Sequence, residues 1–255
     1  MMDVVLKKGK EKSLLRRHPW VYDTAVARIS GQAGPGDLVR VVSNSGLVLG
    51  IGGYSPASSL RVRMWTFHEA DDVASTAFLQ KRLGEALRAR EDLLKRTTAR
   101  RLVFAEADGL PGLVVDQYGD WLVTQFQSAA VEARREAITS ILMELTGAKG
   151  VFDRSDAATR QREGLAPHVG VLAGDEPPER IEVIEDGVRY GVDVRKGHKT
   201  GFYIDQRESR LAAQRLAREF REKNGRGLRV LNCFCYTGGF SPVSYTHLRA
   251  HETLA

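Results

Sequence analysis

The sequence predicts a mixed α/β and α+β chain that ends in the first part of a Rossmann-like sheet. Alternating apolar and polar residues over 1–68 indicate short strands, and strand and helix patterns mingle over 99–180. Near the end, the apolar run Leu228–Asn232 leads into the glycine-rich turn Thr237–Gly239. In nucleotide-binding sheets the first strand reaches its ligand through such a turn. Because several strand–helix units normally follow, we expect this last domain to be incomplete.

Composition is that of an ordinary globular protein, with 42% hydrophobic and 27% charged residues over 255 positions. No apolar run reaches the length of a membrane span, and the N-terminus lacks a signal-peptide core. Cys233 and Cys235 are too few for a zinc site and are placed unfavourably for a disulfide. We therefore expect a cytoplasmic protein with no metal and no membrane partner.

The net charge of +6 is concentrated at the start of the chain. Residues 1–68 contain ten Lys and Arg against four Asp and Glu, whereas the remainder is neutral. A basic module suits a polyanionic partner, although a solvated basic face explains the charge equally well.

The first 68 residues predict a β-rich module with one helical insert. Leu38–Val42 and Leu47–Gly52 flank the turn sequence Asn44-Ser45-Gly46, which predicts a hairpin. Leu60–Trp65 alternates apolar and basic residues, so a strand would place Arg61 and Arg63 on one face.

A connector and an α+β domain follow. Helical spacing predicts one long helix over 71–96, opened by Asp71 or Asp72, within a connector at 69–98. The central domain, 99–180, predicts strands near 101–106, 112–117, 121–127 and 150–153, with a helix at 130–145 that ends at Gly147. Proline and glycine over 164–180 predict a loop or linker.

The last predicted domain covers 181–241. It opens with a hairpin around Asp186-Gly187, continues with an amphipathic helix from Gln206 to about Lys223 that Asp205 caps, and reaches the strand Leu228–Asn232. Residues 242–255 lack helical periodicity. Back-translation of 242–253 gives the transposon-end adapter used in sequencing libraries, so we expect these residues to be an artefactual tail rather than a natural polar one.

The glycine turn is a weak signal by itself, because a tight strand-to-helix turn explains it as well. Upstream, Lys196–Arg207 surrounds two glycines with polar and aromatic residues. Phe202 and Tyr203 offer a flat surface for a purine or a sulfonium ligand. A helix cap explains Asp205, but it does not explain Lys199, Thr200, Gln206 and Arg207 together.

Six segments taken together resemble the RlmI-type ribosomal RNA large-subunit methyltransferases. They are collinear between about residue 4 and Ser241 and comprise Gly9–Val21, Tyr54–Ser58, Asp108–Gly112, Asp153–Asp156, Gly197–Arg207 and Val230–Phe240. The resemblance implies a PUA-like RNA-binding β-barrel at 1–68, a central α+β domain, and the start of a class I methyltransferase domain at 181–241. It also implies S-adenosyl-L-methionine as cofactor and methylation of a cytosine at carbon 5 in large-subunit ribosomal RNA.

The same resemblance implies the cofactor-binding residues, which lie in the upstream segment and the glycine turn. They are Phe202, Asp205, Gln206, Arg207, Asn232, Phe234, Tyr236, Thr237 and Gly238. Cys235 stands where a serine is expected, a small change. Methylation at carbon 5 uses a cysteine thiolate that adds to carbon 6. The family's nucleophile lies far downstream, so neither Cys233 nor Cys235 is assigned this role, and the 255-residue chain is expected to be inactive.

Basic side chains of the first module are the RNA-binding candidates, since phosphates dominate affinity for RNA. They are Lys10, Lys12, Arg16, Arg17, His18, Arg61 and Arg63. Trp20 can stack on an unpaired base, but a core anchor beside Pro19 is favoured for it. Asp153–Asp156 is interpreted as a local salt-bridged turn without a substrate role.

Two alternative functions stay open. A related ribosomal RNA methyltransferase acting on a guanine nitrogen would need no cysteine nucleophile, and an RNA-binding module would need no catalysis at all. The sequence leaves the modified nucleotide and the oligomeric state open, a homodimer included.

Overall fold

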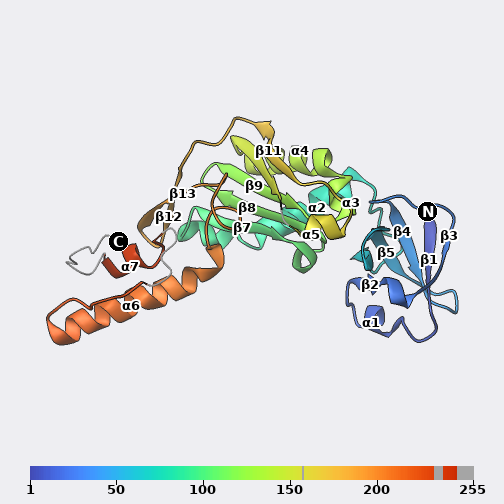
Figure 1. Ribbon diagram of the computed structural model, residues 1–255, viewed down its shortest axis with the longest axis horizontal. Helices are drawn as coiled ribbons and strands as arrows, with labels where there is room; N and C mark the ends of the chain where they lie inside the picture. The colour runs from blue at the N-terminus through green and yellow to red at the C-terminus, as the bar shows by residue number, and fades with distance from the viewer. Residues whose placement is uncertain (157, 233–237, 246–255) are drawn as a thin grey trace. The chain divides into compact units, whose positions relative to one another are not determined.

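The computed structural model describes residues 1–156, 158–232 and 238–245, with the side chain of Tyr245 left out. Figure 1 shows its helices and strands along the chain. Contacts within the chain divide it into two compact units. The first unit comprises Met1–Glu91 and Arg101–Glu176, and the second comprises Asp92–Arg100 and Pro177–Ala255.

The N-terminal part of the first unit is a six-stranded sheet, in the order β2-β6-β5-β4-β1-β3. Its strands are β1 (Met2–Leu6), β2 (Trp20–Tyr22), β3 (Val26–Ser30), β4 (Leu38–Val42), β5 (Val48–Tyr54) and β6 (Leu60–Thr66). Strand β1 pairs with β4 in parallel, and the other described pairs are antiparallel. Helix α1 (Lys12–Leu15) and the 3-10 turn η1 (Asp23–Ala25) connect the first strands.

The predicted hairpin and the predicted strand at Leu60–Trp65 are confirmed. Strands β4 and β5 pair around Gly46, whose φ of 91° only glycine adopts readily. Val62 and Met64 of β6 are buried in the core of this sheet, while Arg61 and Arg63 point to its other face. The alternation in the sequence therefore orients this strand correctly.

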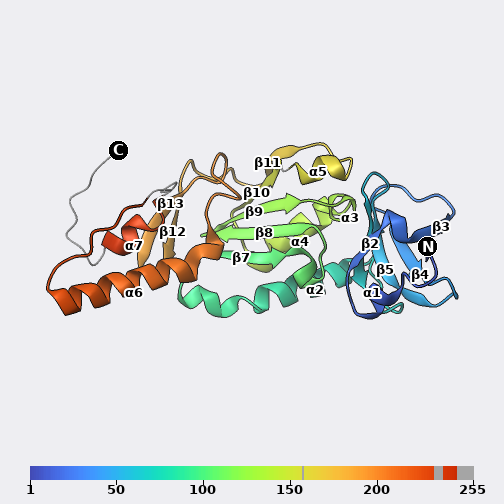
Figure 2. The same cartoon turned by 60° about the horizontal axis from the view of Figure 1, so that its bottom comes forward.

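The central part of the first unit is a five-stranded sheet in the order β11-β10-β9-β8-β7 (Figure 2). Its strands are β7 (Ala99–Phe104), β8 (Leu113–Tyr118), β9 (Trp121–Phe126), β10 (Gly150–Ser155) and β11 (His168–Gly174). Helices α2 (Thr76–Arg88) and α4 (Arg135–Thr146) contact each other and share one apolar core with the sheet. Shorter helical segments of this part are η3 (Ala105–Asp108), α3 (Ala129–Glu132) and α5 (Thr159–Arg162), while η2 (Glu91–Lys95) leads into the second unit. Gly147 ends α4 in the left-handed conformation, as expected.

The expected single helix over 71–96 is wrong, because the segment is interrupted. Asp71 accepts a hydrogen bond from the Thr66 hydroxyl, and Ser75 caps α2 by accepting from the backbone N–H of Phe78 at 3.2 Å. At the other end, Arg90 donates to the carbonyl of Ala86 and pairs with Asp108. Side chains thus satisfy the backbone groups at both ends of a shorter helix.

The expected loop over 164–180 is also wrong in part, since β11 extends from His168 to Gly174 and pairs antiparallel with β10. The glycine that suggested a loop marks a close approach of backbones. A Cβ on Gly174 would lie 2.2 Å from the carbonyl oxygen of Lys149. Glycine inside a strand commonly has this meaning.

The second unit contains the expected hairpin and amphipathic helix. Strands β12 (Ile181–Glu185) and β13 (Val188–Val192) pair antiparallel around Asp186-Gly187. The 3-10 turn η4 (Ile204–Gln206) leads into α6 (Arg207–Asn224), and α7 (Ser241–Tyr245) contacts α6.

Two local expectations in this unit fail. Residues Leu228–Asn232 form no strand, and Leu231 is 87% exposed, because no neighbouring strand among the described residues supplies a hydrogen-bonding ladder. The N-cap residue of α6 is Gln206, without a side-chain cap hydrogen bond, rather than Asp205, which pairs with Lys199. The expected tail, 242–255, lies outside the described residues from 246 onward. Among the helices described, none is long and apolar enough to cross a membrane.

Candidate functional site

The upstream candidate segment, 196–207, lies between β13 and α6. Gly201 lies at φ 132°, and a Cβ there would lie 2.8 Å from Cγ1 of Val192. Lys199 Nζ lies 2.8 Å from the Asp205 carboxylate and 4.5 Å from the centre of the Tyr203 ring. The lysine therefore neutralises Asp205 and covers one side of Tyr203. Gln206, another candidate, is exposed at the N-terminus of α6.

Arg210 is the centre of a buried cluster beneath this segment. Its guanidinium donates to both carboxylate oxygens of Glu185 at 2.6 and 2.9 Å, and both side chains are 2% exposed. The same guanidinium donates to the carbonyl of Tyr203 at 2.9 Å and lies 4.5 Å from the Phe202 ring centre. Arg210 thereby joins α6, β12 and the candidate segment.

Two of the expected cofactor-binding side chains are engaged in this cluster. Phe202 is only 2% exposed and packs against Tyr190 with ring centres 5.1 Å apart. Arg207 is also buried, with its Nε 3.6 Å from Glu185. Because Phe202 is buried between Arg210 and Tyr190, its ring serves the packing of the segment rather than an open flat surface. Tyr203 remains half-buried.

The glycine turn lies next to the same cluster. The Tyr190 hydroxyl donates to the carbonyl of Gly239 at 3.4 Å, and a Cβ on Gly239 would lie 3.7 Å from Cδ of Arg210. Burial, with a smaller contribution from the Glu185 carboxylate, raises the pKa of Tyr190 to about 12, so its hydroxyl stays a donor. The structure thus brings the upstream segment and the glycine turn together, as the sequence suggested.

The remaining turn residues are only partly described. Gly238 lies at φ 71°, and a Cβ there would meet no described atom within 4 Å. Asn232 Nδ2 donates to the Ser241 hydroxyl at 3.1 Å. The candidates Phe234, Tyr236 and Thr237, like both cysteines, lie outside the described residues.

Sequence reasoning missed Arg210, Glu185 and Tyr190. The signal was present in the hairpin, where Glu185 occupies the same buried face of β12 as Ile181 and Val183. A carboxylate at an inward strand position requires a buried cationic partner. A second pair supports the hairpin turn: Arg96 donates to both Asp186 oxygens at 2.8 and 2.9 Å and lowers the pKa of that carboxyl.

The basic candidates around α1 lie on the surface of the N-terminal sheet. Lys10, Lys12, Arg16, Arg17 and His18 are all exposed. Arg17 adopts φ 64°, and its guanidinium lies 5.2 Å from the Phe67 ring centre. These exposed basic side chains are accessible for contacts with the phosphates of an RNA.

The two basic candidates of β6 are engaged within the protein. Arg63 pairs with buried Glu163 at 2.9 Å and lies 3.7 Å from Glu106, while Arg61 donates to the Pro56 carbonyl. Glu163 follows α5 of the central part, so Arg63 joins the two sheets of the first unit.

The expectation that Trp20 is a core anchor is wrong. Its side chain is 37% exposed, and the indole N–H donates to Glu106 at 3.0 Å. Trp20 alternates along β2 with buried Val21, so it lies on the outer face of the strand.

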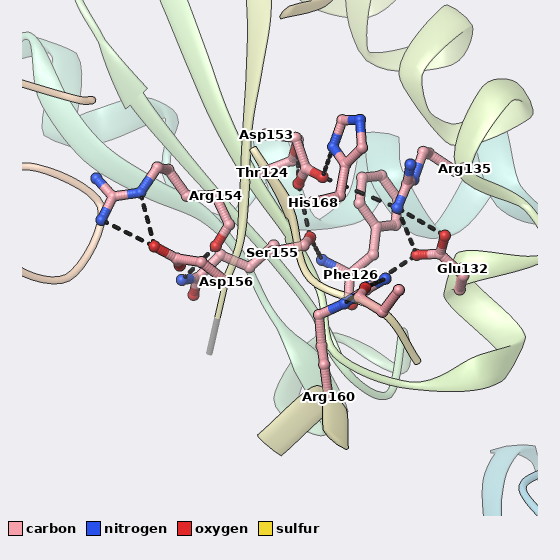
Figure 3. Close-up of polar contacts among 12 residues, drawn as sticks. Thr124, Phe126, Glu132, Arg135, Asp153, Arg154, Ser155, Asp156, Arg160 and His168 are labelled. Carbon is pink, nitrogen blue, oxygen red and sulfur yellow. Dashed lines mark hydrogen bonds and ion pairs between the residues drawn. The ribbon is translucent and has the colours of Figure 1, made fainter. Parts of the chain in front are cut away.

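Asp153–Asp156 is not a local turn, since residues 150–155 form β10 in the interior of the central sheet. Asp153 is fully buried and interacts with Ser155, Thr124 and His168, at 2.7, 3.3 and 2.7 Å respectively (Figure 3). Burial raises the pKa of Asp153 against the opposing effect of these hydrogen bonds. Figure 3 also shows Arg154 pairing with Asp156 on the other side of the strand, at 3.4 Å.

Family models match both parts of the chain. A PUA-like domain matches residues 4–67, and an S-adenosylmethionine-dependent methyltransferase matches residues 108–249. Because the second model covers more than half of the chain, the chain belongs to the S-adenosylmethionine-dependent methyltransferases. The expected class of enzyme, its cofactor and the PUA-like module are thereby confirmed at the level of the family.

Two curated relatives with the same name are similar to almost the whole chain. The chain is 44% identical over 240 residues to "Ribosomal RNA large subunit methyltransferase I" of Shigella boydii serotype 4, and equally to the protein of that name from Enterobacter sp. strain 638. In both cases 93% of this chain matches 58% of the relative, so the chain spans less than two thirds of their length.

Solved structures agree in fold. A putative SAM-dependent methyltransferase from Streptococcus mutans matches with a TM-score of 0.76 at 21% identity, over 97% of this chain and 61% of that one. A putative methyltransferase complexed with SAH matches with a TM-score of 0.77, also at 21% identity, over 97% of this chain and 60% of that one.

Proposed function

We propose that the protein carrying this chain methylates a cytosine at carbon 5 of large-subunit ribosomal RNA, with S-adenosylmethionine as methyl donor. The observation that carries the proposal is the collinear 44% identity to relatives named as large-subunit ribosomal RNA methyltransferases. The basic N-terminal module and the soluble composition fit an RNA substrate and a cytoplasmic location.

The cofactor contacts belong to the second unit. The glycine turn offers backbone without a side chain at Gly238, next to open space among the described residues. Asp205 and Tyr203 lie on the upstream segment, which Arg210 fixes against the same turn through Tyr190. Since Lys199 neutralises Asp205 and covers one side of the Tyr203 ring, the other side of this ring is the group that suits a ligand combining a cation with an adenosine.

The substrate contacts belong to the first unit. The exposed side chains of Lys10, Lys12, Arg16 and Arg17 supply positive charge for phosphates. The cysteine nucleophile that carbon-5 methylation needs is assigned to neither Cys233 nor Cys235, because both flank the cofactor turn.

Base analysis of methylated RNA tests the proposal. The complete reading frame is incubated with S-adenosylmethionine and unmodified large-subunit RNA, and the product nucleosides are identified by mass spectrometry. We expect 5-methylcytidine, also from the variant in which Cys233 and Cys235 are both serine. Methylguanosine as product would support the nitrogen methyltransferase instead, and an unmodified RNA would support a module that only binds.

A further inference from the structure

An aromatic row runs from His18, two residues before the edge strand β2, along the outer face of that strand. His18, Trp20 and Tyr22 alternate with Pro19 and buried Val21, and all three side chains are exposed. The ring centres of His18 and Trp20 are 5.5 Å apart, those of Trp20 and Tyr22 are 6.5 Å apart, and the planes are perpendicular. Exposed apolar side chains that gather in one patch, rather than lying singly, are typical of a binding surface.

Cationic side chains flank this row. Trp20 pairs across the strands with Arg63, which lies on the same outer face of β6 as Arg61, but both arginines are engaged within the protein. The positive charge available to phosphates therefore comes from the exposed basic residues of 10–17, directly before the row. Aromatic and cationic groups interleaved on one surface suit a nucleic acid strand, whose bases stack while its phosphates pair with cations.

The Trp20 ring is fixed in place before any ligand binds. Its indole N–H and the Arg63 guanidinium both approach the same oxygen of Glu106, at 3.0 and 3.7 Å. A ring held in this way loses little conformational freedom when a base stacks on it.

We propose that His18, Trp20 and Tyr22 form a base-stacking surface for unpaired RNA. The module then captures a single-stranded segment of its substrate and does not depend on phosphate contacts alone. A duplex buries the faces of its bases, so it offers this surface nothing to stack on. The inference deepens the proposed function by naming the form of RNA that is bound, and it rests on that function for the choice of RNA.

Binding by the 255-residue chain tests this without cofactor or catalysis. A labelled single-stranded oligouridine, an RNA duplex of equal length and an abasic strand of equal charge are compared by fluorescence anisotropy. We expect the single strand to bind at least about tenfold more tightly than the abasic strand, because each stacked base contributes measurably. Trp20→Ala and Tyr22→Ala should each weaken the single strand about tenfold and leave the abasic strand unchanged.

Tryptophan fluorescence provides a readout that a structural role would not move. Trp65 is buried and Trp121 lies on β9, so Trp121→Phe leaves Trp20 as the exposed fluorophore. Oligouridine should quench this variant, whereas the abasic strand should not. Circular dichroism verifies that the alanine variants are folded. Equal affinity for all three ligands, or unaltered binding by both alanine variants, would overturn the proposal whether or not the complete protein methylates cytosine.

Discussion

Replacing Arg210 by methionine removes the buried cation that joins α6, β12 and the 196–207 segment within the second unit. The carboxylate of Glu185 then stays buried without its two-pronged partner, which costs about 3–5 kcal/mol in comparable pairs. Arg207, whose Nε lies 3.6 Å from the same carboxylate, offsets part of this cost. Since the contact with the Phe202 ring is also lost, we expect about 3–4 kcal/mol of destabilisation in total.

Native-state hydrogen exchange measures this loss where it occurs. The three tryptophans all lie in the first unit, so their fluorescence monitors that unit, while the amides of α6 report on the second. Exchange in α6 should accelerate about 100- to 1000-fold in Arg210→Met, with tryptophan unfolding unchanged.

The matched control is Arg215→Met, which makes the same substitution at an exposed position of α6. It should change the stability by less than about 0.5 kcal/mol. Removing both charges with Glu185→Gln and Arg210→Met should cost less than the sum of the single changes, because neither charge is then left unpaired. If α6 exchanges equally in Arg210→Met and Arg215→Met, the assigned role of the buried pair is wrong.

Three further changes test the first unit. Gly53→Ala would place a Cβ 2.2 Å from the Cβ of Ala130, so urea unfolding monitored by tryptophan should show a loss of about 1–3 kcal/mol, and no loss would contradict the packing. Burial raises the pKa of Asp153, so the charged carboxylate destabilises the folded protein. The stability contributed by the neutral form is fully present below the unfolded pKa of about 4 and is lost as the pH rises through the folded pKa. The free energy of unfolding of Asp153→Asn should therefore rise relative to that of the wild type as the pH increases from about 4 through the folded pKa. A difference in stability that does not change with pH would refute this. Arg63→Gln leaves buried Glu163 unpaired and should cost about 2–4 kcal/mol, which adding Glu163→Gln should partly restore in the same assay.

The sequence located most elements because their signals are local. Alternation along Leu60–Trp65 fixed which face of β6 is buried, and the glycine at position 147 ended α4 where expected. Asn44–Gly46 and Asp186-Gly187 likewise set two hairpins through backbone conformations that few residues tolerate.

The errors arose where contacts distant in sequence decide the structure. The interruption after Arg88 depends on the pairing of Arg90 with Asp108, and β11 forms because β10 offers it an edge. Trp20 is exposed because Glu106, 86 residues away, holds its indole. No local pattern contains this information.

The candidate site was found only in part. The upstream segment and the glycine turn are brought together as expected, but the residues that join them, Arg210 and Tyr190, carried no motif. The individual cofactor contacts stay predictions. The inactivity of the 255-residue chain also stays a prediction, and methyl transfer by this chain would contradict it.

Transfer of a labelled methyl group to ribosomal RNA measures the proposed activity itself. The complete reading frame is incubated with tritiated S-adenosylmethionine and with large-subunit or small-subunit RNA, each unmodified. We expect label in the large-subunit RNA, and we expect it to be lost when Lys10, Arg16 and Arg17 are replaced by glutamate. Label confined to the small-subunit RNA, or absent from both, would contradict it.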